Sequence, residues 1–183
     1  MGQYLVTGLA VNLRVFKEEM AKVEMDLNAL IQEMEKCLHF SPALYTPQEE
    51  KSYFVFRLKE DILHQELIPF LQKFYPLIYH QDNYTDFNSV LERLKLTPPD
   101  NWLALAKEKK YETFQLDPDG DLAYLDRPFG RMVSIRYESI LLCMEGKIMM
   151  ETYGRQFTFF QYCITKAFSE FALSGAVRIY ITG

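Results

Sequence analysis

The segment from Val133 to the C-terminus constrains the fold more than any other part of the sequence. Apolar and polar residues alternate over 133–138, which is the pattern of a half-buried strand. Residues 140–144 are apolar throughout, which indicates that both faces of the strand are covered or that a bulge near Ser139 shifts the register. A turn, a second strand, a helix and a last strand over 177–181 follow with almost no loop. The segment therefore predicts a compact α+β domain.

Residues 137–152 fit two structures. In the first, two strands form a hairpin around Glu145 and Gly146, because glycine accepts the positive φ that tight hairpin turns need. In the second the segment is helical, because apolar residues also recur at helical spacing: Tyr137, Ile140, Leu141, Met144 and Ile148. Gly146 and the β-branched residues before it disfavour a helix, so the hairpin is the favoured prediction.

A stripe of apolar side chains predicts a helix after this hairpin. Its members recur at intervals of mainly three and four residues: Phe157, Phe160, Ile164, Ala167, Phe168 and Phe171. A stripe of this kind either packs in the core or lines a ligand site, and burial is the more common use of large apolar residues. We therefore expect the stripe to be buried against the predicted C-terminal strands.

The N-terminal part predicts a second strand-helix-strand unit. Residues 4–16 read as a long strand, 17–38 as an amphipathic helix, 41–50 as a loop with two prolines, and 52–58 as a strand. Gly8 has no second glycine at the spacing of a dinucleotide-binding turn, so it indicates a bulge or a close contact within a strand. The acidic face of the helix is interpreted as solvent-exposed, with docking of a cationic partner as the alternative.

Residues 59–108 predict a helical insertion between two β-rich halves. Pro69 is expected to kink or delay one helix and Pro76 to end it, whereas Thr97 is expected to cap the start of the last one. The element order on either side of the insertion is compatible with ferredoxin-like halves. We predict a single α+β domain, residues 1–183, with a mixed or antiparallel sheet packed against helices.

The composition limits the kinds of molecule that the chain is expected to bind. The chain of 183 residues has 20 Lys and Arg against 25 Asp and Glu, a net charge of −5 that disfavours nonspecific binding to nucleic acid or an anionic membrane. Neither a secretory signal nor an apolar stretch of transmembrane length is present, so a cytoplasmic location is predicted. The cysteines, Cys37, Cys143 and Cys163, form no C-x-x-C pair, and the histidines form no ligand pair. We therefore predict no disulfide framework, no bound metal and no cofactor.

The most distinctive local feature is the alternation of carboxylates from Asp117 to Asp121. It does not match a Ca²⁺-binding EF-hand loop, because Leu122 and Pro128 stand where that motif needs glycine and glutamate. Proline, aspartate and glycine in succession favour a turn between two strands instead. With its polar neighbours the turn is predicted to form a recognition surface, whose candidate binding residues are Asp119, Asp121, Tyr124, Asp126 and Arg127.

Three functions are compatible with these features. The favoured hypothesis is a non-catalytic cytoplasmic interaction protein, such as an inhibitor or immunity-type partner that covers a basic protein, since the chain is acidic and has no catalytic motif. Its expected aromatic anchors are tyrosines in predicted loops: Tyr45, Tyr84 and Tyr124. The alternatives are a small-molecule-binding domain with an aromatic-lined pocket, supported by Trp102 and the many tyrosines and phenylalanines, and an enzyme with a dispersed site.

Overall fold

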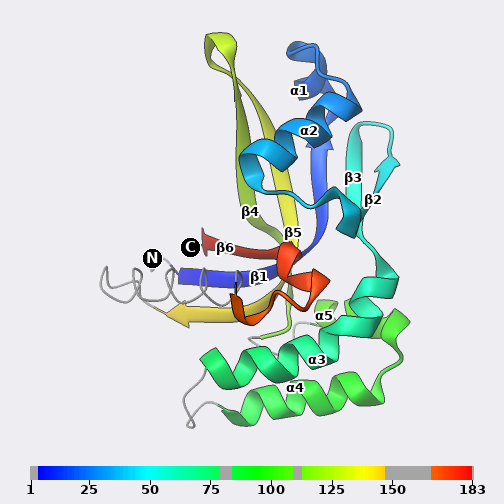
Figure 1. The fold of residues 1–183 in the computed structure, drawn as a ribbon, viewed down its shortest axis with the longest axis vertical. Coiled ribbons are helices and arrows are strands. Elements are labelled where there is room, and N and C mark those ends of the chain that lie inside the picture. Colours follow the sequence, from blue (N-terminus) through cyan, green and yellow to red (C-terminus); the bar gives the residue numbers. More distant parts are fainter. Residues whose placement is uncertain (1–3, 79–83, 109–112, 147–165, 183) are drawn as a thin grey trace.

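The computed structural model describes residues 4–78, 84–108, 113–146 and 166–182, and it confirms the predicted α+β class. A six-stranded antiparallel sheet curls through the molecule, with helices packed against its upper and lower parts (Figure 1). The strands are β1 (Tyr4–Phe16), β2 (Tyr45–Glu49), β3 (Tyr53–Leu58), β4 (Leu116–Arg127), β5 (Arg131–Gly146) and β6 (Val177–Thr182).

The long strand β1 organises the sheet. The strand order is β2-β3-β1-β5-β4, and β6 also pairs with β1. On the edge of β1 away from β5, residues 12–16 pair with β3 and residues 4–9 pair with β6. In a ferredoxin-like half the two strands joined by a helix are separated by another strand. Here the helical segment 17–38 joins β1 to β2, and β3 lies between these two strands, so this part of the sheet has that arrangement.

The sheet bends where β1 departs from regular pairing with β5. The register shifts between Thr7 and Gly8 and again between Ala10 and Asn12, and such bulges increase the bend and twist of a strand. In Figure 1, β1 crosses the lower part of the molecule and then turns upward. A Cβ atom on Gly8 would lie 2.9 Å from the Cβ atom of Ser139, which confirms the predicted close contact.

The two ends of the sheet are buried differently. In the upper part β1 alternates: Leu13 and Val15 are buried, whereas Asn12 and Arg14 are partly exposed on the opposite face. Helices α1 (Lys17–Lys22) and α2 (Leu27–Leu38) cover the apolar face there (Figure 1). In the lower part every residue from Leu5 to Val11 is buried. Beneath it lie α3 (Glu60–Ile78), α4 (Tyr84–Leu96), α5 (Trp102–Lys107) and the 3-10 turn η6 (Ala172–Ala176).

Two predictions for the N-terminal part are wrong. The helix expected over residues 17–38 is broken at Glu24, which adopts a left-handed φ of 53°, and Asp26 then caps α2 by accepting a hydrogen bond from the Ala29 amide at 2.8 Å. The loop expected over 41–50 contains strand β2, which includes Pro47. Proline is tolerated there because β2 is an edge strand.

The helical insertion forms where predicted, but its boundaries differ. Pro76 does not end α3, which continues to Ile78, because a buried apolar face that includes Phe70 and Phe74 holds the helix in place. The Thr97 hydroxyl donates to the Arg93 carbonyl at 2.7 Å, so it closes α4 instead of capping the next helix. None of the described helices is both long and apolar enough to cross a membrane.

Only some of the predictions for the C-terminal segment fall on described residues. Residues 137–146 belong to strand β5, so the helical alternative is wrong there, and the remainder of the predicted hairpin lies outside the described residues. The first half of the aromatic stripe, Phe157 to Ile164, also lies outside them. Phe168 is buried and packs on Phe70 and Phe74, with ring centroids 5.0 and 5.9 Å apart, so this section of the stripe is core packed against α3.

Candidate interaction surface

Strands β4 and β5 form a long hairpin that rises beside α1 at the top of the molecule (Figure 1). Its loop is the 3-10 turn η4 (Pro128–Gly130), in which Phe129 and Gly130 have φ values of 65° and 68°. A phenylalanine with positive φ is uncommon because its Cβ approaches the following carbonyl. The Phe129 side chain is 98% exposed, so this unusual conformation places a large aromatic ring in solvent at the tip.

The outward face of the hairpin is apolar at several positions. Among the described residues six large apolar side chains are exposed, and four of them belong to this hairpin. Leu122, Tyr124 and Met132 are 45, 50 and 53% exposed, while the intervening Leu125 is buried. We call Leu122, Tyr124, Phe129 and Met132 the hairpin strip.

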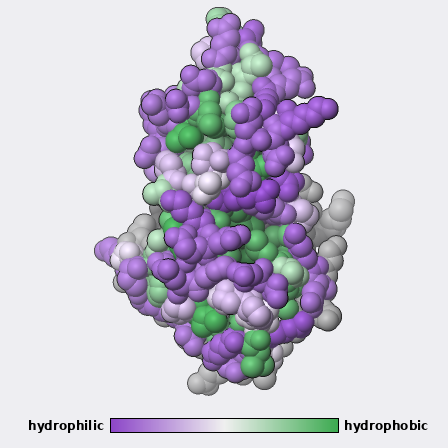
Figure 2. Space-filling view, turned by 90° about the vertical axis from the view of Figure 1, so that its right-hand side faces the viewer, coloured by the Kyte–Doolittle hydropathy of each residue, from purple (hydrophilic) through white to green (hydrophobic). Residues whose placement is uncertain are grey.

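A different side of the molecule lacks such a feature. Figure 2 shows the side that carries β2 and β3, where hydrophilic residues cover most of the surface and apolar residues appear as separate patches. Isolated apolar residues are normal on protein surfaces, whereas a cluster on one projecting element indicates a contact surface.

The predicted binding residues do not form one surface, because they lie in a strand and not in a turn. The segment from Asp117 to Asp121 is a bulge within β4, opposite Ser139 and Tyr137. Strand alternation then divides the predicted residues between two faces. Tyr124 and Asp126 are exposed on the outward face, Asp121 and Arg127 belong to the opposite face, and the side chain of Asp119 lies outside the described residues.

The carboxylates of the bulge take part in structural contacts. Asp121 accepts hydrogen bonds from Arg178 Nε and Nη2 at 3.0 and 2.9 Å, and the same guanidinium lies 4.3 Å from the centre of the Tyr137 ring. The Tyr180 hydroxyl donates to Asp117 at 3.2 Å. Burial raises the pKa of both tyrosines, and the neighbouring carboxylates add to the effect at Tyr180. The described residues contain no group of three or more His, Cys, Asp or Glu side chains placed to hold a metal.

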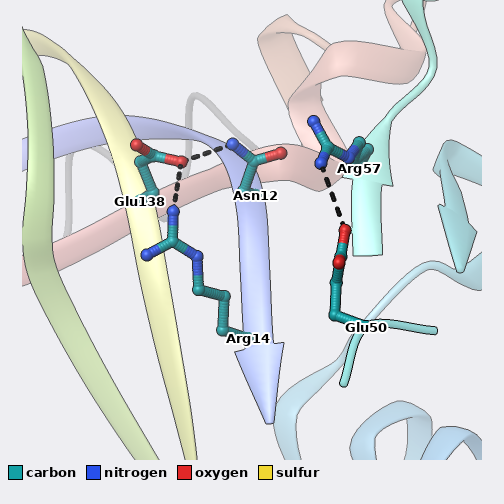
Figure 3. Close-up of polar contacts among 5 residues, drawn as sticks. All are labelled: Asn12, Arg14, Glu50, Arg57 and Glu138. Atoms are coloured by element: carbon teal, nitrogen blue, oxygen red, sulfur yellow. Dashed lines mark hydrogen bonds and ion pairs between the residues drawn. The ribbon is translucent and has the colours of Figure 1, made fainter. Parts of the chain in front are cut away.

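Polar side chains form two sets of contacts on either side of β1 (Figure 3). Glu138 on β5 is buried, and it accepts hydrogen bonds from the Asn12 amide and from Arg14 Nη2 on β1, the latter at 3.4 Å. On the far side of β1, Arg57 of β3 turns toward Glu50 at 3.9 Å. The contacts of Glu138 connect β1 to β5, and the polar groups that make them have hydrogen-bond partners within the sheet.

The hairpin is attached to the α1–α2 segment. Its polar contacts there include Arg131 Nη1 with the Lys22 carbonyl at 2.7 Å and Arg127 Nη1 with Glu33 at 3.8 Å. Glu19 also accepts hydrogen bonds from the amide and hydroxyl of Ser134 at 2.7 and 2.6 Å. Helix α2 also lies over β4. The upper part of the hairpin and the α1–α2 segment, distant in sequence, therefore form one end of the folded molecule (Figure 1).

The same two segments are the acidic parts of the chain. Residues 17–38 contain six carboxylates and three lysines, and the hairpin, residues 116–146, contains six carboxylates and three arginines. Each segment therefore has a net charge of −3, whereas the remaining residues together have a net charge of +1. We call these two segments the acidic half. Its exposed carboxylates include Glu18, Glu24, Asp26, Glu35 and Asp126.

The tyrosines predicted as aromatic anchors differ in exposure. Tyr124 is exposed, but Tyr45 is buried and its hydroxyl donates to the Ala10 carbonyl at 3.0 Å, so Tyr45 is wrong as an anchor. The side chain of Tyr84 lies outside the described residues. Trp102 is also buried, and its indole nitrogen lies 3.1 Å from two backbone carbonyls. Sequence reasoning missed Phe129, although proline and glycine on either side of it are a turn signal.

Comparisons of the chain with protein-family models, with curated proteins and with solved structures found no match. The candidate surface is therefore defined by the geometry and charge of this chain alone.

Proposed function

We propose that this chain is a non-catalytic interaction protein, of the inhibitor or immunity type, which binds a basic protein through its acidic half. The observation that carries the proposal is that the α1–α2 segment, with a net charge of −3 over residues 17–38, lies beside the hairpin that presents the hairpin strip. The exposed carboxylates of the α1–α2 segment attract a basic partner from a distance and orient it before contact. The exposed aromatic and aliphatic side chains then supply the contact area that slows dissociation.

The neighbouring polar surface supports this assignment. Glu138, Asn12 and Arg14 bond to one another, so a partner that covers them meets polar groups whose hydrogen bonds are already made. Tyr124 and Phe129 are the principal anchors, because aromatic side chains combine large contact area with few rotatable bonds. The proposed surface thus has an apolar centre and a charged border, as in many protein interfaces.

The first experiment identifies the partner and measures its charge dependence. The tagged full-length chain is incubated at low salt with lysate from its native cells, and captured polypeptides are identified and then purified separately. We expect a basic polypeptide whose association rate with this chain falls as salt rises, since the screening length is about 10 Å at 0.1 M. The proposal would be contradicted by a captured partner that is neutral or acidic, or by an association rate that does not change with salt concentration.

The second experiment locates the surface. Phe129→Ala and Tyr124→Ala should each raise the dissociation rate of the captured partner, by roughly tenfold or more for a central anchor. Leu96→Ala is the matched control, because Leu96 is 85% exposed but lies at the end of α4, outside the acidic half. A loss of binding in Leu96→Ala with none in the two hairpin variants would place the interface elsewhere.

A further inference from the structure

Strand β4 lies at one edge of the sheet, because β5 is the only strand that pairs with it among the described residues. The other edge strand, β2, is short, and Pro47 at its centre removes a backbone donor, which protects that edge from pairing with another chain. In β4 the proline and the bulge both lie in the lower part, within residues 117–121. Residues 122–126 pair regularly with β5 and have neither protection, so the upper part of β4 is a regular sheet edge.

A hydrogen bond of β5 shows which backbone groups of β4 point to this edge. Ser134 lies opposite Tyr124, and its amide donates to the Glu19 carboxylate at 2.7 Å, so it does not donate to Tyr124. Opposite residues in an antiparallel pair either exchange both backbone hydrogen bonds or direct both groups away from each other. The N–H and C=O of Tyr124 therefore point to the outer edge. Leu122 and Asp126, two residues away on either side, have the same orientation.

The charge beside this edge is negative. Asp126 is exposed on the strand itself, and the hairpin has a net charge of −3. The neighbouring cations make contacts within the molecule, since Arg131 donates to the Lys22 carbonyl and Arg127 lies 3.8 Å from Glu33. Pairing with a second copy of the chain would bring two acidic hairpins together, and their like charges would repel. The edge is therefore suited to a basic strand from another protein.

We propose that the basic partner adds an extended strand to the outer edge of β4 at residues 122–126. The backbone of that strand bonds to the outward N–H and C=O groups of β4. On the exposed face its apolar side chains lie beside Leu122 and Tyr124, and on the opposite face, over which α2 lies, its basic side chains point toward Glu33. The partner segment is thus one in which Lys or Arg alternates with apolar residues. This inference rests on the proposed function and specifies how the partner binds.

A synthetic peptide with only these features tests the edge without the partner. The probe is a short acetylated peptide in which lysine and valine alternate, titrated at low salt into the full-length chain, and the control peptide has glutamate in place of lysine. We expect saturable binding of the lysine peptide with a dissociation constant below about 1 mM. The glutamate peptide should bind at least about tenfold more weakly. Absence of binding of the lysine peptide, or equal affinity of the two peptides, would overturn the proposal.

Amide hydrogen exchange followed by NMR shows whether the bound peptide pairs with β4. In the free chain the amides of Ala123 and Leu125, which point to β5, should exchange slowly, and those of Leu122, Tyr124 and Asp126 should exchange fast. The lysine peptide should slow exchange at least about tenfold at the second set. The proposal is wrong if these three amides still exchange fast with the peptide bound, or if self-association already protects them in the free chain.

Two variants at one position separate the backbone from the side chain. Leu122→Pro removes an outward donor but no hydrogen bond to β5, whereas Leu122→Ala shortens the side chain and keeps the donor. The affinity for the lysine peptide should be about tenfold lower in Leu122→Pro than in Leu122→Ala, with both folds checked by circular dichroism. Equal affinities would show that the peptide does not use the β4 backbone. If the captured partner still depends on Tyr124 and Phe129, the proposed function then stands and only the strand pairing fails.

Discussion

The upper and lower regions of the sheet use the same two strands, β1 and β5, in different ways. In the lower region β1 is buried continuously from Leu5 to Val11, with helices beneath it, whereas in the upper region Asn12 and Arg14 lie on a face of the strand that is only partly covered. The α1–α2 segment, which has a net charge of −3 over residues 17–38, lies beside this upper region. A strand covered on both faces can only contribute stability, whereas a strand with a free face can also present side chains to a partner.

The largest expected difference in stability is between substitutions of two phenylalanines at opposite ends of the molecule. Phe168→Ala should lower the free energy of unfolding by about 3–5 kcal/mol, because Phe168 is only 2% exposed and its loss leaves a cavity against α3. Phe129→Ala should change it by less than about 0.5 kcal/mol, because that ring is in solvent. Urea denaturation measures both. A loss below about 1 kcal/mol for Phe168→Ala would show that the lower region is not the stabilising core.

A smaller difference in stability is expected between alanine substitutions of two glycines, which the fold requires for different reasons. Gly8→Ala should cost about 1–3 kcal/mol, because the new Cβ atom meets Ser139 and Tyr180 at 2.9 and 3.1 Å where the sheet bends. Gly130→Ala should cost about 1 kcal/mol through its positive φ alone, because no atom lies within 4 Å of the new Cβ. The same denaturation series compares them. Equal stability of the Gly8→Ala variant and the wild type would show that the bend does not require close packing.

The buried tyrosines predict a dependence of stability on alkaline pH. Burial raises the pKa of Tyr45 above its usual value, so the folded state favours the neutral phenol. That contribution is fully present below about pH 10 and is lost as pH rises through the folded pKa, by up to about 1.4 kcal/mol per pH unit. Denaturation between pH 8 and 11 should show this decline, and Tyr45→Phe should make it shallower. An identical decline in the variant would show that Tyr45 does not cause it.

The smallest effect concerns metal binding at the β4 bulge. Asp121 is bonded to Arg178, and the segment lacks the EF-hand register, so the chain should show no Ca²⁺ affinity in the micromolar range. Calorimetry on chelator-treated protein measures this. A saturable isotherm that disappears in Asp119→Ala would contradict the prediction and would move the functional site from the hairpin tip to the bulge.

The sequence predicts those elements of the fold whose patterns are local. Strands β1, β3 and β6 follow from their apolar residues, as does the helical insertion. The candidate surface was predicted less well, because a run of carboxylates looks the same in a turn and in a bulged strand. Only the pairing of β4 with β5 shows that Asp121 and Tyr124 lie on opposite faces. Residues 17–38 and the hairpin are distant in sequence, and only the tertiary contacts between them show that they form one surface.

Hydrogen–deuterium exchange of the chain alone and in complex with its captured basic partner tests the central claim most directly. We expect slower exchange on binding in residues 17–38 and 122–136, which include the exposed carboxylates and the hairpin strip. We expect unchanged exchange in α3 and α4, which support the lower region of the sheet. Protection confined to α3 and α4, with none at the hairpin, would contradict the assignment of the acidic half as the binding surface.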